Sequence, residues 1–200
     1  MPQPAVFLDR DGTLNEDAGY LERIERLRLF PWSLEAVRLL RQAGYAVVVV
    51  TNQTGVGRGM LREEFVGETL DYLQTRLGAI GQRLDGHYCC PHDPHAPLEA
   101  YRRACNCRKP RPGMVLQAAR DLDLDLGRSV AVGDKWSDVA LARNTGMRGL
   151  LVRTGYGATQ EAAPREGLAA DAVVPDLMAA VVWILREMPR PHPAGRKPAT

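Results

Sequence analysis

The stretch Val6-Phe7-Leu8-Asp9-Arg10-Asp11-Gly12-Thr13-Leu14 is an apolar run that ends in two carboxylates spaced one residue apart. It predicts a buried strand that delivers Asp9 and Asp11 to the carboxyl end of a sheet, where open α/β proteins bind their ligands. Such a pair can hold Mg²⁺, and one of its members can attack a phosphorus atom. An Asp-x-Asp pair alone is also compatible with a helix cap or a solvated loop, so its meaning depends on the rest of the chain.

The composition predicts one globular domain over residues 1–188, followed by a disordered tail at 189–200 that is rich in Pro, Arg and Lys. The apolar fraction of 45% is sufficient for a core, and the net charge of +2 does not favour binding to nucleic acid or to a membrane surface. We find neither a secretory signal nor an apolar run of roughly 20 residues, so we expect a cytoplasmic protein. In that compartment the four cysteines are metal ligands or free thiols rather than disulfides.

Apolar runs alternate with helical patterns along the chain, which predicts an α/β fold with a doubly wound parallel sheet. A glycine-rich loop is expected at 55–59, and the stretch 89–112, with its many prolines, needs a function or a metal to organise it. Strands are predicted at 5–8, 45–50, 85–89, 129–132, 149–152 and 172–174. Helices are predicted from Ser33 as N-cap to Gly44, over 62–77 and 112–122, from a cap at Ser137 or Asp138 to about Thr145, and from a cap at Asp176 to about Met188.

Four strand ends or loops offer complementary groups. They are Asp9 with Asp11, Thr51 with Asn52, Arg108 with Lys109, and Gly133-Asp134-Lys135 followed by Asp138. Carboxylates, neutral donors and a lysine are the groups that phosphoryl transfer requires, because a metal and cations neutralise the charge on the transferring oxygens.

These motifs, in this order, resemble those of the haloacid dehalogenase-like (HAD) phosphohydrolases. The resemblance is closest to the heptose-1,7-bisphosphate 7-phosphatase family, of which the histidinol phosphatases are close relatives. It rests on residues 7–15, 17–20, 49–55, 88–92, 105–110 and 132–135, and it covers about residues 5 to 155.

The resemblance implies roles for individual residues. Asp9 would be the nucleophile, Asp11 the general acid and base, and Thr51 and Lys109 the groups that hold the transferring phosphoryl group. Mg²⁺ would bind Asp9, the backbone carbonyl of Asp11, and Asp134. Substrate contacts are expected at Asp17, Gly19, Tyr20, Thr51, Asn52, Gln53, Thr54, Arg108, Lys109 and Lys135. Asp138 would orient Lys135 or support the metal site. Position 18 is Ala where the family form carries His, so one contact to the sugar is missing.

Cys90-x-His92 and Cys105-x-Cys107 supply three sulfurs and one nitrogen, the ligand set of a closed structural zinc site. We therefore expect a zinc-organised loop over 89–110 that holds Arg108 and Lys109 over the active site. Cys89 would be a spare thiol, and His95 is the rival of His92 as a ligand.

The prediction is a Mg²⁺-dependent phosphomonoester hydrolase without a large cap domain, acting on a small phosphorylated sugar. The resemblance implies removal of the 7-phosphate of heptose 1,7-bisphosphate, through an aspartyl-phosphate, on the path to the nucleotide-activated heptose of lipopolysaccharide. The alternatives are a histidinol-phosphate phosphatase and a non-enzymatic, zinc-organised binding module. We expect a monomer.

Overall fold

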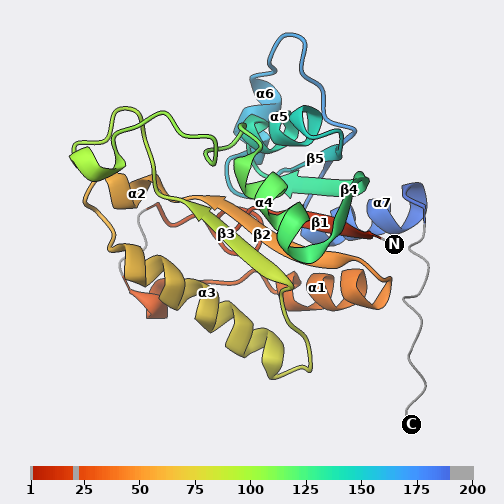
Figure 1. The fold of residues 1–200 in the computed structure, drawn as a ribbon. Coiled ribbons are helices and arrows are strands. Elements are labelled where there is room, and N and C mark those ends of the chain that lie inside the picture. The colour runs from red at the N-terminus through yellow and green to blue at the C-terminus, as the bar shows by residue number, and fades with distance from the viewer. Residues whose placement is uncertain (1, 20–22, 190–200) are drawn as a thin grey trace.

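The structure is a computed structural model that describes residues 2–19 and 23–189. It contains six parallel strands in the order β3-β2-β1-β4-β5-β6 (Figure 1). Their bounds are Gln3–Leu8 for β1, Ala46–Asn52 for β2, Gly86–Cys90 for β3, Leu124–Gly133 for β4, Arg148–Val152 for β5 and Ala172–Val174 for β6. The doubly wound parallel sheet predicted from the sequence is therefore confirmed.

Helices cover both faces of the sheet. They are α1 (Ser33–Gln42), α2 (Thr54–Gly57), α3 (Glu63–Gly78), α4 (Gly113–Leu122), α5 (Trp136–Asn144), α6 (Gly157–Ala162) and α7 (Leu177–Glu187), with short 3₁₀ helices η1 (Ile24–Arg26) and η2 (Glu99–Tyr101). Val6 and Leu8 of β1 pack into a core shared with α1, α3 and α7, whereas Phe7 packs on the opposite side with α4 and α5. Because both faces are covered, the central strands contain continuous apolar runs, as at residues 5–8 and 46–50.

The structure corrects several predicted boundaries. Ser33 is not the N-cap of α1 but its first residue, and its hydroxyl donates to the Leu14 carbonyl at 2.6 Å. Lys135, rather than Ser137 or Asp138, is the N-cap of α5, with Asp138 completing a capping box. Asp176 does cap α7, as predicted, by accepting from the backbone at 2.9 Å.

Two helices and part of a strand were missed. The expected glycine-rich loop contains α2, and α6 follows β5 directly. Strand β4 begins at Leu124 because Gln3 and Pro4 extend β1 and pair with Leu124 and Asp125, after which the register shifts.

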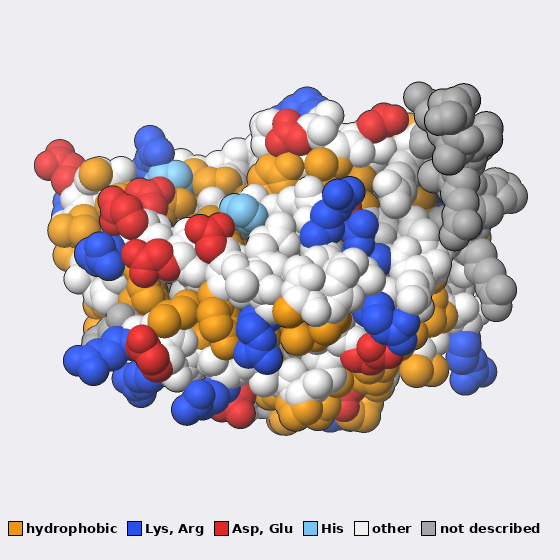
Figure 2. All heavy atoms as spheres, turned by 90° about the horizontal axis from the view of Figure 1, so that it is seen from below, with side chains coloured by type: hydrophobic (Ala, Val, Ile, Leu, Met, Phe, Trp, Pro, Cys, Tyr) orange, Lys and Arg blue, Asp and Glu red, His pale blue; other side chains and the backbone are white. Residues whose placement is uncertain are grey.

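The outer surface carries charges of both signs. Figure 2 shows one face on which Lys and Arg side chains lie among Asp and Glu side chains. Within residues 2–19 and 23–189, no helix has the length and apolar character needed to cross a bilayer. Residues 20–22 and 190–200 lie outside the described residues, so the predicted contact at Tyr20 and nearly all of the predicted tail are not described.

Candidate active site and zinc cluster

A cavity of about 270 Å³ opens at the carboxyl edge of the sheet. Its lining includes most of the predicted site residues, and the full set is Asp9, Asp11, Asp17, Gly19, Asn52, Gln53, Thr54, Gly55, Leu61, Lys109, Lys135, Ser137 and Tyr156. The parallel strands place their carboxyl ends at this edge, which explains why residues so distant in sequence meet there.

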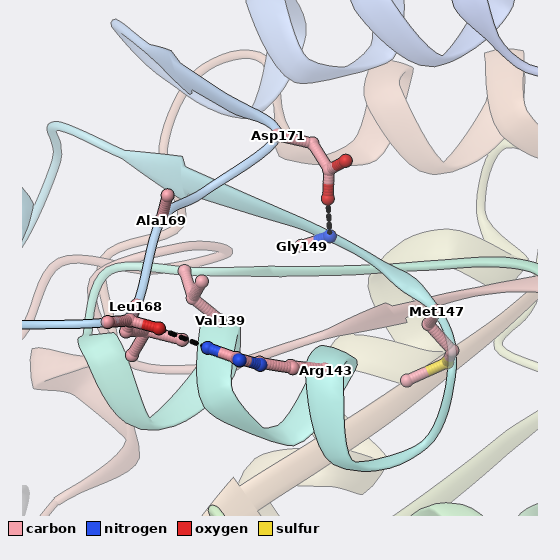
Figure 3. A pocket seen from close by; sticks show the side chains of 8 residues that line it. Val139, Arg143, Met147, Gly149, Leu168, Ala169 and Asp171 are labelled. Carbon is pink, nitrogen blue, oxygen red and sulfur yellow. Dashed lines mark hydrogen bonds between the residues drawn. The ribbon is translucent and has the colours of Figure 1, made fainter.

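A larger cavity of about 450 Å³ lies between α5, β5 and the segment that precedes β6 (Figure 3). Val139, Met147 and Leu168 contribute apolar side chains to its lining, and the Asp171 carboxylate accepts a hydrogen bond from the Gly149 backbone. Because it contains none of the predicted catalytic groups, we place the site in the smaller cavity.

Lys109 joins two of the acids. Its Nζ lies 3.0 Å from Asp9 Oδ1 and 2.6 Å from Asp138 Oδ1, and it donates to the Val50 carbonyl at 2.8 Å. Burial opposes the charge on this amine, but the Asp138 and Asp9 carboxylates outweigh burial and raise the pKa of Lys109. The lysine is therefore a fixed cation beside Asp9.

Three carboxylates gather around this point. Oxygens of Asp9, Asp134 and Asp138 lie within 4.8 Å of one another, and all three residues are buried. Asp134 Oδ2 accepts from the Tyr156 backbone N–H at 2.8 Å, whereas no residue that the structure describes donates a hydrogen bond to the buried Oδ1. Burial, together with the charge of Asp9, raises the pKa of Asp134 to about 7. This buried oxygen faces the Lys135 ammonium at 3.4 Å without a hydrogen bond and lies beside two further acids, a donor set that fits Mg²⁺.

Gly12 keeps this site open. Its φ is +80°, and a Cβ at this position would lie 2.2 Å from Asp134 Oδ2. A side chain here would therefore be strained and would displace the carboxylate.

Asp11 faces a set of donors. Its Oδ1 accepts from Arg10 Nε at 3.0 Å and from Asn15 Nδ2 at 2.9 Å, and its Oδ2 accepts from Arg10 Nη2 and Gln53 Nε2, both at 2.8 Å. Burial opposes its ionisation, but the Arg10 charge and these hydrogen bonds lower the pKa of Asp11. Its carboxylate is thus held by four nitrogen atoms at the cavity wall.

The polar residues at the end of β2 contact Asp11 on one side and the Lys109 backbone on the other. Gln53 Nε2 also donates to Thr51 Oγ1 at 2.9 Å, which links the buried Thr51 to Asp11. Asn52 exchanges two hydrogen bonds with the Lys109 backbone, at 3.2 and 3.0 Å. Asn52 therefore fixes the segment that carries the buried lysine, while Thr54 lines the cavity.

Lys135 also lines the cavity. Its Nζ lies 3.4 Å from both Asp17 Oδ2 and Asp134 Oδ1, and 4.8 Å from the centre of the Tyr156 ring. Burial opposes its charge, but Asp9, Asp134 and Asp17 raise the pKa of Lys135. The cavity lining therefore presents a second, more accessible cation.

The cysteine and histidine pairs also come together. The Sγ atoms of Cys90, Cys105 and Cys107 lie 3.1 to 3.5 Å apart, and His92 Nδ1 lies 3.3 Å from Cys107 Sγ. These separations are far longer than a disulfide bond and place four ligand atoms around one point, which fits tetrahedral zinc. Of the candidate histidines, His92 joins this group.

The last cysteine of the zinc cluster, Cys107, lies two residues before Lys109 in the sequence. Arg108 follows Cys107, but its Nη1 donates to the His92 carbonyl at 3.2 Å, and Arg108 is not part of the cavity lining. In this conformation Arg108 therefore contacts the loop, whereas Lys109 enters the site.

The sequence analysis did not include every residue of the site. Asp138 was expected to orient Lys135 or to support the metal site. Its carboxylate pairs with the Lys109 ammonium, lies in the cluster with Asp9 and Asp134, and accepts from the backbone N–H of Lys135 at 3.2 Å. Tyr156 and Arg10 were missed. Arg10 could have been found from its position between the two acids in the sequence. No sequence pattern indicates that Tyr156 belongs to the site.

Comparisons with known proteins agree with this arrangement. Residues 106–180 match the HAD-hydrolase-like family model. The D-glycero-beta-D-manno-heptose-1,7-bisphosphate 7-phosphatase of Yersinia pestis is 44% identical over 79% of this chain and 85% of its own length. The D-glycero-D-manno-heptose-1,7-bisphosphate 7-phosphatase of Thermosynechococcus vestitus is 44% identical over 92% of this chain and 96% of its own length.

A solved structure extends the likeness to three dimensions. The D,D-heptose 1,7-bisphosphate phosphatase from B. bronchiseptica, complexed with magnesium and phosphate, has a TM-score of 0.80 and 34% identity, covering 92% of this chain and 99% of that one. The fold, the acids at the sheet edge and these likenesses agree, and the chain belongs to the D-glycero-D-manno-heptose-1,7-bisphosphate 7-phosphatase family of HAD-like hydrolases.

Proposed function

We propose that this chain is a Mg²⁺-dependent phosphatase that removes the 7-phosphate of D-glycero-D-manno-heptose 1,7-bisphosphate, on the path to a nucleotide-activated heptose of lipopolysaccharide. The observation that carries the proposal is the placement of Lys109 Nζ between Asp9 and Asp138, beside the buried acid Asp134. The names of the relatives support the choice of substrate. A cytoplasmic location and a monomeric state stay predictions.

Asp9 is the proposed nucleophile. Its described contacts, from the Arg10 backbone N–H and from Lys109, fall on Oδ1, which leaves Oδ2 to attack phosphorus. Attack forms an aspartyl-phosphate and releases the sugar oxygen, which takes a proton from Asp11. Asp11 then removes a proton from the water that hydrolyses the aspartyl-phosphate.

Mg²⁺ would be held by Asp9, Asp134 and the Asp11 carbonyl, and when bound it neutralises charge on the phosphoryl oxygens. Lys109 and Thr51 complete the proposed phosphoryl site from the protein side. Asp17, Lys135 and Tyr156 form the wall against which we place the sugar. Zinc at Cys90, His92, Cys105 and Cys107 would have no open position, so we assign it a structural role.

The test is phosphate release from heptose 1,7-bisphosphate and from histidinol phosphate, measured side by side with Mg²⁺. We expect a higher kcat/KM for the heptose. A higher value for histidinol phosphate would overturn the substrate assignment and leave the reaction class intact.

Asp9→Asn tests the chemistry. We expect turnover to be abolished with the fold retained, while Asp71→Asn, at an exposed position of α3, keeps full turnover. Normal activity in Asp9→Asn would leave a binding module as the better interpretation.

A further inference from the structure

Arg10 lies between the two acids in sequence, but its side chain is only 4% exposed. Its guanidinium uses all three nitrogens. Nε and Nη2 donate to the two oxygens of Asp11 at 3.0 and 2.8 Å, and Nη1 donates to Thr69 Oγ1 at 2.6 Å. This is a two-pronged contact between two planar groups, which fixes orientation as well as distance.

Thr69 anchors the other end of Arg10. It lies on α3, is 1% exposed, and its hydroxyl donates to the Val66 carbonyl at 2.7 Å. A hydroxyl has one hydrogen, so the direction of both bonds is set and Thr69 can only accept from Arg10. The guanidinium is therefore fixed to the helix as well as to the acid.

Two further donors, Asn15 and Gln53, contact the Asp11 carboxylate at 2.9 and 2.8 Å. Gln53 lines the cavity, whereas Arg10 approaches from the buried side. The plane of the Asp11 carboxylate is thus set from behind by a group that does not line the cavity.

We propose that Arg10 and Thr69 are positioning residues for the proton transfer. Arg10, anchored by Thr69, holds the Asp11 carboxyl group where it can reach the leaving sugar oxygen. This role rests on the proposed function. As the bond from Asp9 to phosphorus forms and the bond to the sugar breaks, the sugar oxygen takes the proton of Asp11. Arg10 transfers no proton, because a guanidinium stays charged.

Two substrates with different leaving groups can distinguish this positioning role from a purely structural one. A sugar alkoxide is a strong base and needs a proton as it departs, whereas a nitrophenolate departs without one. Misplacing Asp11 should therefore slow release of the sugar from an alkyl phosphate and spare release of nitrophenolate from p-nitrophenyl phosphate. Both releases are measured in a single turnover, because the later attack of water on the aspartyl-phosphate uses Asp11 with either substrate. General damage to the site would slow both.

Thr69→Val removes the acceptor with little change in shape. In a single turnover we expect release of the sugar from the heptose bisphosphate to slow about tenfold, which is a part of the roughly 10²- to 10⁴-fold that a positioned general acid contributes, while release of nitrophenolate stays within about twofold of the wild type. Thr69→Ser, which keeps the hydroxyl, should retain the wild-type rate on both substrates. Thr75→Val is the matched control, because Thr75 lies on the same helix, is exposed, and donates to a backbone carbonyl without contacting an arginine.

Equal losses on the two substrates, or no loss on either, would overturn the inference. Circular dichroism and thermal melting check the fold. If Thr69→Val does not fold, Arg10→Lys keeps the charge but loses the two-pronged contact, and the same ratio of rates decides.

Failure of the proposed function is visible in the wild type, as no release of the 7-phosphate. In that case any alkyl phosphate that the wild type hydrolyses, such as histidinol phosphate, serves for the same ratio. A wild type that hydrolyses no phosphomonoester would overturn both proposals.

Discussion

Replacing Asp134 with Asn should stabilise the Mg²⁺-free protein at alkaline pH. Asp134 is fully buried, and its pKa is raised from 3.8 to about 7 by burial and by Asp9. At 1.36 kcal/mol per pKa unit, ionising this group in the folded state costs about 4 kcal/mol. Asn keeps a carbonyl oxygen for the Tyr156 N–H and carries no charge, so we expect a gain of about 2–4 kcal/mol at pH 8.

The pH dependence gives the sign. The folded state binds the Asp134 proton more tightly than the unfolded chain does. Below about pH 4 the acid is protonated in both states and does not lower the free energy of unfolding. As the pH rises from about 4 to about 7, the free energy of unfolding falls, and above about 7 this loss is complete. The difference in unfolding free energy between Asp134→Asn and wild type should therefore grow from pH 5.5 to pH 8.5. Taking this difference removes the contribution of the histidines, which both proteins share.

The free energy of unfolding of both proteins is measured by urea unfolding from pH 5.5 to pH 8.5. Mg²⁺ is first removed by dialysis, without a strong chelator, so that the zinc stays bound. Saturating Mg²⁺ should stabilise the wild type and leave Asp134→Asn unchanged, because the variant has lost a proposed ligand. An Asn variant no more stable than wild type at pH 8, or one whose advantage is the same at pH 5.5, would refute the reasoning.

Three other changes have defined outcomes. Cys107→Ser should lower the zinc content measured by atomic absorption and lower kcat, because Cys107 lies two residues before Lys109; unchanged zinc would contradict the assigned ligand set. Gly12→Ala should destabilise by about 1–3 kcal/mol and weaken Mg²⁺ binding in calorimetry, because its Cβ would collide with Asp134; normal Mg²⁺ affinity would count against it. Asp176→Ala should remove about 1 kcal/mol of stability through loss of the α7 cap, read as a lower Tm with kcat unchanged, and an unchanged Tm would argue against the cap.

The sheet could be predicted because its signals are local. Residues 47–50 are β-branched at every position, and Asp9, Gln53 and Asp134 each follow a strand directly. Parallel strands bring those ends to one edge, so the pattern of single strands also predicts which residues gather. The same holds for Asp176, whose capping role depends only on the helix that follows it.

The remaining features depend on contacts between distant segments. Lys109 pairs with Asp138, and Thr69 meets Arg10 across 59 positions, and no periodicity indicates either contact. Tyr156 reaches the site through its backbone and its ring, neither of which has a sequence motif. Helix α2 has four residues, two of them Gly, and its composition favours a turn.

The position of β1 in the sheet also affects synthesis of the chain. β1 lies between β2 and β4, and β4 ends only at Gly133. While the chain emerges from the ribosome, β1 can pair with β2 early, but its other edge stays exposed until more than half of the protein has been made. Such an unpaired apolar edge can associate with other chains, so this protein is most prone to aggregate during the translation of residues 53 to 133. Asp9, the proposed nucleophile at the end of β1, likewise gains Lys109 only late in that interval, and Asp134 and Asp138 only after it.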